Sequence, residues 1–541
     1  MIPAAIGQRI HTVRTLAGAG IIGPVRPDKL VRIGAALRRF GPTPAAGYAA
    51  SAIRYTDEAA IVDELGTLSF SEVHRRTNAL AHGLSDHGVG EGDGVAIMCR
   101  NHRGFIDATV ACSKLGANAL YLNTAFAGPQ ITDVVKREAP RALIFDHEFT
   151  DLVRDAAVRR KRFIAWHGGD DDVQDPTLEE LIEQGDPAEV VPPSEPGRAV
   201  ILTSGTTGTP KGASRKQPES LDPAAALLSK IPLHARETTM IAAPLFHSWG
   251  FAHFTLGLGL SSTLVLRRRF DPEETLSATA QHEATTLAVV PVMLQRILEL
   301  PEETIARYDV SALRVIAASG SALTPTLSKR VMDAFGDVLY NLYGSTEVAW
   351  ASIATPQDMR AAPGTVGRAP RGTVLRIYDP DGREVPEGET GRIFVGNEML
   401  FEGYTGGGTK DVIDGLMATG DVGHFDKSGR LFVDGRDDEM IVSGGENVFP
   451  QEVEELLAGH DKVADVAVVG VPDEEFGQRL KAVVVTKGKA KLSAEDVKGF
   501  VKQHLARYKV PRDVEFMDEL PRNATGKVLK RELREDPEEG S

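Results

Sequence analysis

Short apolar runs alternate with stretches of helical spacing along the first two thirds of the chain. Val73, Thr77, Leu80 and Leu84 follow one another at spacings of four, three and four, which places them on one face of a helix. Apolar runs at residues 95–98, 142–145 and 163–166 are typical of buried strands. Strands that alternate with helices in this way predict stacked βα units built around parallel sheets.

The same pattern continues and then changes twice. A second series of apolar strands is expected at residues 263–266, 287–291 and 313–318. Between about 365 and 433 the strands shorten, with turns at Asp379-Pro380-Asp381-Gly382 and Asp426-Lys427-Ser428-Gly429, and this predicts a small antiparallel barrel. The last part predicts helix, strand, strand and helix at 451–458, 463–471, 480–486 and 493–506.

These patterns predict an α/β protein with a large and a small part. The large N-terminal domain has two βα-layered subdomains and a small β-barrel, and the small mobile C-terminal domain is α+β. A chain of 541 residues exceeds what one hydrophobic core usually supports, so several domains are expected. The expected divisions are a basic N-terminal arm at 1–45, the large domain at 46–434, a hinge at 435–439, a lid domain at 440–534 and an acidic tail at 535–541.

Charge and cysteine content restrict the function. A net charge of −15 argues against binding of nucleic acid, because a polyanion would be repelled. The two cysteines, Cys99 and Cys112, are too few for a disulfide framework and fit a reducing, cytoplasmic location. No clustered Cys/His spacing suggests structural zinc.

The first forty residues differ in charge from the rest of the chain. They hold seven basic residues and one acid, Asp28, together with apolar residues such as Ile10, Val13 and Ile22. Two interpretations stay open. The segment rests on the anionic inner face of a membrane as a peripheral contact, or it is a helical arm packed on the acidic body.

The most informative stretch follows the apolar run at 199–202. Glycine allows successive backbone N–H groups to point into one concavity that holds phosphate oxygens, and hydroxyls and a lysine add donors and charge. Pro210 stands where a Walker loop needs glycine, so the stretch is not a Walker loop. The stretch reads Thr203, Ser204, Gly205, Thr206, Thr207, Gly208, Thr209, Pro210, Lys211, Gly212.

This order of residues resembles the phosphate loop of the adenylate-forming superfamily, which includes acyl- and aryl-CoA synthetases. The resemblance covers about residues 50 to 534. It implies that ATP, Mg²⁺ and CoA are used, with Thr203, Ser204, Gly205, Thr206, Thr207, Gly208 and Lys211 at the phosphates and Thr203 also near the metal.

Other motifs of the superfamily follow in order. The resemblance places Tyr343 and Gly344 against adenine, Thr346 at the α-phosphate and Glu347 on Mg²⁺. It also implies that Gly320, Ser321 and Ala322 lie beside the adenine, and that Asp421 and Arg436 bind the ribose. Asp438 is the expected hinge; the family usually has Asp where this chain has Glu439.

The C-terminal motifs imply two half-reactions. In the motif Pro521-Arg522-Asn523-Ala524-Thr525-Gly526-Lys527, Lys527 is expected to bridge the carboxylate and the α-phosphate during adenylate formation. A rotation about Asp438 would then withdraw Lys527 and bring the glycine loop into the pantetheine channel. The residues expected to contact CoA are Ser443, Gly444, Gly445, Phe476, Tyr508 and Lys509.

The acyl site is expected to begin at His247. Amino-acid-activating relatives carry an Asp at this position, so an α-amino acid would stay unpaired here. The apolar stretch after Phe251, a candidate gate, includes Gly257 and Gly259, and these small residues leave room for an alkyl chain or serve helix packing. We favour a medium- or long-chain fatty acid, with an aryl acid as the alternative. No insertion is seen between 348 and 435, which favours CoA over a carrier protein.

Two other classes of function are weighed against the ligase. A non-catalytic acyl or nucleotide binder would not need Lys527, Glu347 and Lys211, which are all present. An oxygenase that uses the adenylate, as luciferases do, has no sequence feature in its favour.

Overall fold

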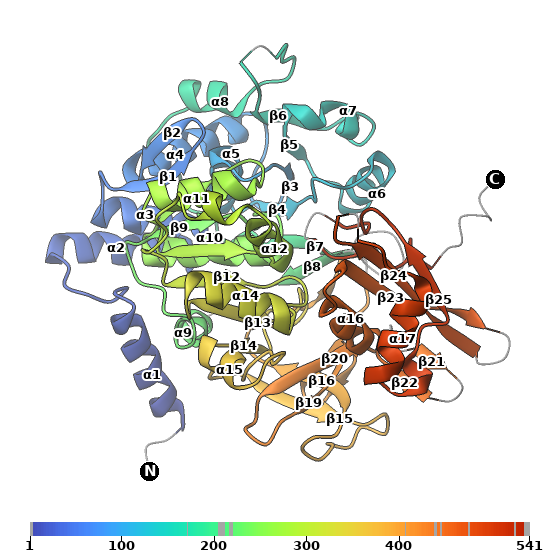
Figure 1. The fold of residues 1–541 in the computed structure, drawn as a ribbon. Helices are drawn as coiled ribbons and strands as arrows, with labels where there is room; N and C mark the ends of the chain where they lie inside the picture. The colour runs from blue at the N-terminus through green and yellow to red at the C-terminus, as the bar shows by residue number, and fades with distance from the viewer. Residues whose placement is uncertain are drawn as a thin grey trace.

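Four β-sheets organise the molecule, which is described here by a computed structural model (Figure 1). The structure describes residues 4–169, 171–203, 211–215, 220–405, 407–437, 441–443, 446–473, 477–488, 490–523 and 526–534. Figure 1 shows two of the sheets within the blue to yellow part of the chain, and the C-terminal sheet in red beside them. The mixed α/β fold with a large and a small part is therefore as predicted.

The first sheet has seven strands in the order β17-β8-β7-β4-β3-β5-β6. Its strands β7, β4, β3, β5 and β6 are parallel, while β8 and β17 are added antiparallel at one edge. The strands are β3 Gly94–Met98, β4 Asn118–Tyr121, β5 Ala142–Asp146, β6 Lys161–Trp166, β7 Ala199–Thr203, β8 Lys211–Arg215 and β17 Gly403–Tyr404.

The second sheet has eight strands in the order β14-β13-β12-β11-β9-β10-β1-β2. Its six inner strands are parallel, and β2 and β14 close the two edges antiparallel. The strand expected at 287–291 ends at Val289, because Pro291 instead opens a helix, where a missing N–H costs nothing. The strands are β1 Ala59–Asp63, β2 Gly66–Ser69, β9 Thr238–Ile241, β10 Thr263–Leu266, β11 Thr286–Val289, β12 Val315–Ala318, β13 Leu339–Tyr343 and β14 Ser352–Ala354.

Helices connect the parallel strands and bury their apolar faces. In α4 the stripe of Val73, Thr77, Leu80 and Leu84 is buried, as its spacing predicts, and a capping box between Ser69 and Glu72 starts the helix. The helices of this part are α3 Pro44–Arg54, α4 Phe70–Asp86, α5 Arg103–Leu115, α6 Gly128–Glu138, α7 Thr150–Val153, α8 Leu178–Gln184, α9 Asp222–Leu228, α10 Ser248–Leu260, α11 Pro272–Gln281, α12 Pro291–Leu298, α13 Glu302–Ile305, α14 Pro325–Phe335 and α15 Pro356–Ala361.

The third sheet lies where the shorter strands predict a small antiparallel barrel, and it is a curled antiparallel sheet. It runs in the order β15-β16-β19-β18, and β20 pairs with β19. Its core includes Leu375, Ile377, Ile393 and Val395. The strands are β15 Val374–Tyr378, β16 Gly391–Gly396, β18 Val412–Ile413, β19 Leu416–Phe425 and β20 Leu431–Arg436.

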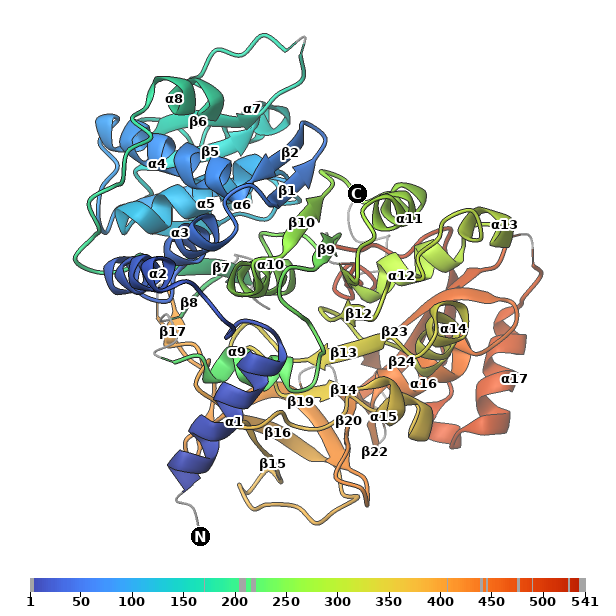
Figure 2. The ribbon, with the colours of Figure 1, turned by 90° about the vertical axis from the view of Figure 1, so that its left-hand side faces the viewer.

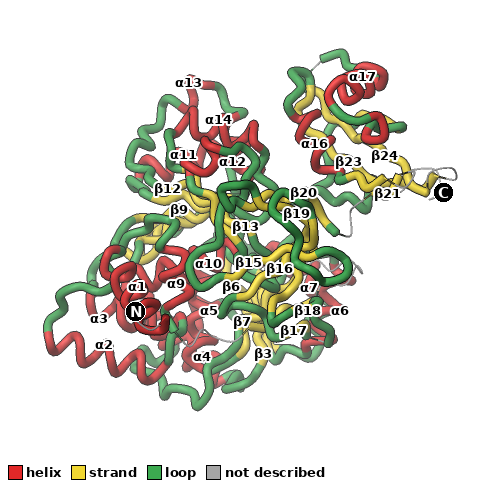
Figure 3. The backbone as a smooth tube through the Cα atoms, turned by 90° about the horizontal axis from the view of Figure 1, so that it is seen from below, coloured by secondary structure: helices red, strands yellow, loops and turns green. Residues whose placement is uncertain are grey.

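The C-terminal part has its own sheet and core. Figure 3, seen from below, shows it as a separate lobe beside the large part. The predicted helix, strand, strand and helix are present, and β21, β22 and β25 complete the sheet in the order β22-β21-β24-β23 with β25 on β24. The elements are β21 Ile441–Ser443, β22 Glu446–Val448, α16 Pro450–Ala458, β23 Val463–Asp473, β24 Gly477–Thr486, α17 Ala494–His504 and β25 Asp513–Phe516.

The basic N-terminal segment forms two helices, α1 (Ala4–Gly18) and α2 (Pro27–Phe40). Figures 1 and 2 show both helices on the side of the large part that is opposite to the C-terminal lobe. Thr12 donates a hydrogen bond to Asp222 of α9 and so ties α1 to the body. Within the described residues, none of the helices combines the length and the apolar character that crossing a bilayer requires.

Candidate active site

Two loops of the predicted nucleotide site leave neighbouring parallel strands at the same sheet edge. Gly320, Ser321 and Ala322 follow β12, and Tyr343 to Glu347 begin at the end of β13. Ligands of open α/β sheets bind at the carboxyl ends of the strands, so this edge is a natural binding position. The hydroxyl of Ser248, in the first turn of α10, donates a hydrogen bond of 3.3 Å to Thr346 Oγ1 and brings His247 to the same edge.

The predicted ribose pair forms one polar cluster with Tyr343. Asp421 of β19 lies opposite Arg436 of β20, and Arg436 donates to Asp421 Oδ1 at 3.1 Å. The Tyr343 hydroxyl donates to Asp421 Oδ2 at 2.5 Å and contacts Thr419 Oγ1 at 3.2 Å. The structure therefore joins the adenine motif to the ribose motif.

The charge of a lysine in the C-terminal lobe acts on this cluster. Burial raises the pKa of Asp421 above its ordinary value, while the nearby cations Arg436 and Lys527 oppose that rise. Lys527 and Asp421 are far apart in sequence, yet their charges are close enough in the fold to interact. Burial also raises the pKa of the Tyr343 phenol, and the charge of the Asp421 carboxylate that accepts its hydrogen bond adds to the rise.

Glu347 is held by a tyrosine that the sequence motifs did not reveal. The hydroxyl of Tyr404 donates to Glu347 Oε1 at 2.6 Å, and the ammonium of Lys211 lies 5.4 Å from the centre of the Tyr404 ring. Tyr404 therefore contacts both Glu347, the candidate metal ligand, and Lys211, a candidate phosphate-binding residue. Its only sequence signal is its place beside Gly403 in a short strand, which is too weak to identify a functional residue.

The predicted phosphate loop joins β7 to β8. Thr203 and Lys211 lie opposite each other in these antiparallel strands, so both ends of the loop are placed. Thr405 donates its N–H to Gly212 O at 2.7 Å and accepts from Gly212 N at 3.1 Å, and this fixes β8 against the end of β17. The loop residues Ser204, Gly205, Thr206, Thr207 and Gly208 lie outside the described residues.

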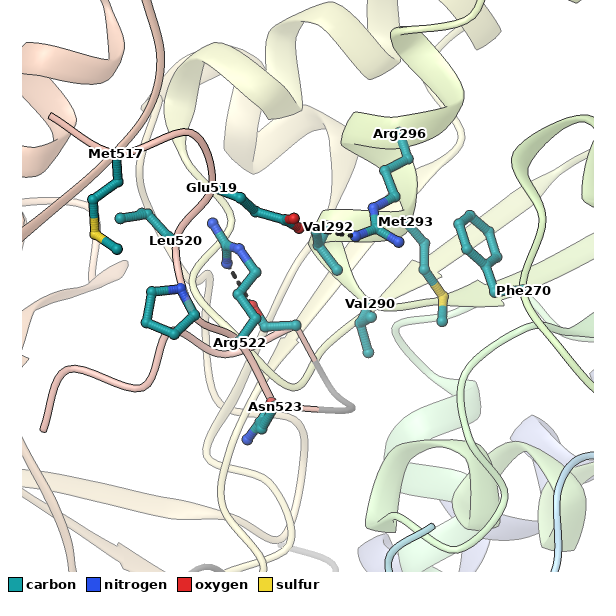
Figure 4. Close-up of a pocket in the computed structure, with 12 residues that line it drawn as sticks. Phe270, Val290, Val292, Met293, Arg296, Met517, Glu519, Leu520, Arg522 and Asn523 are labelled. Carbon is teal, nitrogen blue, oxygen red and sulfur yellow. Dashed lines mark hydrogen bonds and ion pairs between the residues drawn. The ribbon is translucent and has the colours of Figure 1, made fainter. Parts of the chain in front are cut away.

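The segment around Lys527 docks on helix α12 of the large part. Asn523 and Lys527 are paired by two hydrogen bonds of 2.9 Å, which close a tight turn at Gly526. Arg296 of α12 forms an ion pair of 3.9 Å with Glu519. Figure 4 shows the cavity between the two parts, of about 550 Å³, with Val290, Met293 and Arg296 on one wall and Leu520, Arg522 and Asn523 on the other.

The predicted CoA and hinge residues are only partly visible. Asp438, Gly444, Gly445 and Phe476 lie outside the described residues, and of Ser443 only the backbone in β21 is described. Tyr508 is exposed, and Lys509 forms an ion pair with Glu452 of α16. Their role at CoA stays a prediction.

His247 caps α10 at the mouth of the expected acyl site. Its Nε2 lies 3.5 Å from the amide nitrogen of Asn123, and burial lowers the pKa of His247 to about 4, so the ring is neutral at pH 7. One turn further, Phe251 lies 5.0 Å from Tyr121 and 5.8 Å from Phe254 between ring centres. The start of α10 is therefore lined by aromatic rings.

A buried group of Cys99, His102 and Asp146 also has the composition of a metal site. Gly104 N–H donates to His102 Nδ1 at 3.0 Å, so the ring proton lies on Nε2, which donates to Asp146 Oδ1 at 2.8 Å. Both ring nitrogens are thus used in hydrogen bonds that fix the start of α5 to β5. We interpret the group as structural.

Comparisons with known proteins agree with this arrangement. A model for AMP-binding enzymes matches residues 48–405, and a model for the C-terminal domain of AMP-binding enzymes matches residues 452–527. The chain belongs to the AMP-binding enzymes of the adenylate-forming superfamily. As an acid–CoA ligase of this family it uses ATP, CoA and Mg²⁺.

The similar proteins differ in the acid that their names give. The chain is 35% identical to an indoleacetate–CoA ligase of Aromatoleum aromaticum, over 86% of this chain and 93% of that protein. It is 33% identical to a feruloyl-CoA synthase of Amycolatopsis, over 89% of this chain and 96% of that one. The solved structure of ATP-bound MatB from Rhodopseudomonas palustris matches with a TM-score of 0.80 and 27% identity, over 91% and 98% of the chains.

Proposed function

We propose that this enzyme forms an acyl-adenylate from ATP and an apolar carboxylic acid and then transfers the acyl group to CoA. The observation that carries the proposal is that the segment preceding Lys527 docks on α12 of the large part, where Gly526 lies against Val292, while the charge of Lys527 acts on Asp421 of the ribose cluster. A lysine carried by this lobe would stabilise charge at the α-phosphate in the first step. It would then be withdrawn from the site when the lobe rotates.

In the first step the acid's carboxylate attacks the α-phosphate and pyrophosphate leaves. Lys527 would neutralise the attacking carboxylate and the α-phosphate, and Thr346 would donate to the same phosphate. Tyr343, with Gly344 and the loop at Gly320, Ser321 and Ala322, would hold the adenine, while Asp421 and Arg436 would hold the ribose hydroxyls.

Glu347 and its neighbours fit a magnesium site. A carboxylate beside hydroxyl groups is a donor set suited to a hard cation, and Tyr404 orients Glu347 for that role. Mg²⁺, when bound, neutralises phosphate charge. Lys211 and the loop from Thr203 to Gly208 would hold the departing pyrophosphate.

In the second step the CoA thiol, after losing its proton, attacks the acyl carbonyl and AMP leaves. We propose that the lobe at 440–534 turns about Asp438, within a hinge at 435–439, relative to the domain at 46–434. Ser443, Gly444 and Gly445 would then line the pantetheine channel, with Phe476, Tyr508 and Lys509 near the CoA nucleotide.

We propose an aromatic or arylalkanoic acid as the substrate. Phe251, whose ring is only partly buried and lies one turn after His247, offers a flat face to an aromatic acid. Relatives named for indoleacetate and ferulate support the same class. A medium- or long-chain fatty acid is the second candidate, because α10 is apolar after Phe251.

Release of AMP with CoA, measured across indoleacetate, ferulate, benzoate and fatty acids of increasing length, tests the proposal. We expect the highest kcat/KM with an aromatic acid. A clear preference for long-chain fatty acids would overturn the aromatic assignment while leaving the ligase chemistry intact. Absence of acid-dependent pyrophosphate exchange and of AMP release across the whole panel would overturn the ligase itself.

A further inference from the structure

Helix α2 has two different faces. Lys29, Ile33, Ala36 and Phe40 follow one another at spacings of four, three and four and point to the body, where Ala36 and Phe40 are buried. Leu30, Gly34 and Leu37 form a second stripe at spacings of four and three, which points away from the body. The helix therefore presents apolar residues on both sides.

The outer face of α2 is exposed to an unusual degree for apolar side chains. Leu30 is 59% exposed, Val31 is 74% exposed and Leu37 is 48% exposed. Single exposed apolar residues are common, but here three lie within eight residues of one helix. We call these three residues the outer face of α2.

The outer face cannot turn inward, because the N-terminal segment is fixed at several points. Lys29 donates to the carbonyl oxygen of Arg54 at 2.9 Å, and Arg54 donates to the carbonyl oxygen of Ile21 at 3.0 Å. Arg39 donates to Val190 O at 2.9 Å. These bonds hold α2 against the body as a rigid platform.

Basic residues surround the outer face. Arg32 and Arg38 are exposed beside it, and among the ion pairs of the described residues none involves either of them. Residues 1–40 hold seven basic residues and a single acid, although the whole chain has a net charge of −15. The segment is a local basic surface on an acidic protein.

The helix before α2 adds to this surface. Ile10 and Val13 of α1, and Ile22 in the connection between the helices, are further exposed apolar residues. Exposed Arg9 and Arg14 lie beside them in the sequence. Figure 2 shows α1 and α2 together on the side of the molecule away from the C-terminal lobe, so a partner bound there would not obstruct the moving part.

We propose that the outer face of α2, with its flanking arginines, docks on the anionic lipid surface of a membrane. Apolar side chains flanked by Arg are the pattern of helices that lie in a membrane interface, where the chains enter the acyl boundary and the cations meet lipid phosphates. The cytoplasmic leaflet carries such anionic lipids.

Charge favours a membrane over a second copy of this chain as the partner of the α2 surface. In a symmetric dimer this basic surface faces a second copy of itself, so the two sets of arginines add electrostatic repulsion to the interface. An anionic bilayer instead attracts this surface and repels the acidic remainder of the protein, which gives the bound enzyme one orientation.

Co-sedimentation of the full chain with vesicles tests the proposal. We expect binding to vesicles that contain phosphatidylglycerol, weak binding to pure phosphatidylcholine vesicles, and loss of binding at high salt. The variant Arg32→Gln/Arg38→Gln should bind about ten-fold more weakly, because each cation near the surface contributes to attraction. The variant Leu30→Ser/Val31→Ser/Leu37→Ser should weaken binding by a similar factor.

A matched control uses exposed valines elsewhere. Val158 is 65% exposed and Val412 of β18 is 55% exposed, and Val158→Ser/Val412→Ser should leave vesicle binding unchanged. No binding to anionic vesicles, or binding that neither α2 variant weakens, would overturn the proposal. A dimer in light scattering that the serine variant converts to monomer, without vesicle binding, would assign the surface to self-association and overturn it as well.

Discussion

Gly526 of the C-terminal lobe fits against Val292 of α12 only because it has no side chain. A Cβ atom at position 526 would lie 2.2 Å from Val292 Cγ1, and the backbone of Gly526 has a φ of +79°. Lys527 follows directly. The close approach of these two residues therefore fixes the segment that carries Lys527 against α12.

Gly526→Ala should prevent this docking and selectively impair the first half-reaction. We expect pyrophosphate exchange to fall by at least about ten-fold, because misplacing a catalytic group by an ångström is costly. Thioester formation from supplied acyl-adenylate should be kept, since that step uses the rotated lobe. The two half-reactions are measured separately in single-turnover assays.

Val292→Gly supplies the matched rescue. Val292→Gly removes the side chain that the new Cβ would meet, so Gly526→Ala/Val292→Gly should regain part of the lost exchange activity. The recovery should be incomplete, because alanine at position 526 still has to adopt a positive φ. Equal loss of both half-reactions in Gly526→Ala, with a normal melting temperature, would contradict the docking role.

Lys527→Ala should remove a charge from the transition state of adenylate formation. We expect a loss of about a hundred-fold or more in pyrophosphate exchange and little change in thioester formation. Lys502→Ala, at an exposed position in α17, is the control and should be neutral. A Lys527→Ala variant that exchanges pyrophosphate at the normal rate would exclude the assigned role.

Tyr404→Phe should weaken the use of magnesium and ATP. The change removes the 2.6 Å hydrogen bond to Glu347 but keeps the ring under Lys211. We expect the KM for MgATP to rise several-fold with a smaller change in kcat, because Glu347 loses its orientation. Tyr378→Phe, in β15, is the control. A Tyr404→Phe effect confined to the KM for the acid would argue against this link.

The sequence motifs identify candidate nucleotide-binding residues but not the residues that support them. Asp421 and Arg436 stand in short motifs with a fixed order, and local residue order is visible in a sequence. Tyr404 and Val292 have no such pattern, because they act through contacts that form only when distant segments pack together. The strands β21, β22 and β25 escaped prediction for a similar reason, since they are short and gain their order from pairing with β24 or β21.

Buried His253 should make the stability of the large domain depend on pH. Its Nε2 is buried without a hydrogen-bond partner among the described residues, and burial lowers the pKa of His253 to about 4 from an ordinary value of about 6.5. Between these values the unfolded chain binds a proton that the folded chain does not. The free energy of unfolding should therefore fall as the pH drops from 6.5 toward 4, and the full stability is present above 6.5.

His253→Leu should reduce this slope without reducing stability at pH 7. His247 has the same pKa shift and remains, so the slope should shrink and not disappear. Urea unfolding at several pH values between 4.5 and 7 measures the change, with exposed His167→Leu as the control. An unchanged slope in His253→Leu would show that other groups govern the acid response.

Two glycines of α10 test whether its small residues serve helix packing or leave room for an alkyl chain. A Cβ at Gly257 would lie 2.7 Å from Leu264 Cδ2, whereas a Cβ at Gly259 would meet no atom within 4 Å. Gly257→Ala should therefore lower the free energy of unfolding by about 1–3 kcal/mol through overpacking. Gly259→Ala should stabilise the helix by up to about 1 kcal/mol, because alanine is the better helix former.

Neither change should alter the relative kcat/KM for acids of different length, because both glycines would serve the helix and not a tunnel. If Gly257→Ala instead shortened the longest acid that is used, with normal stability, an alkyl tunnel along α10 would gain support and the aromatic assignment would lose it.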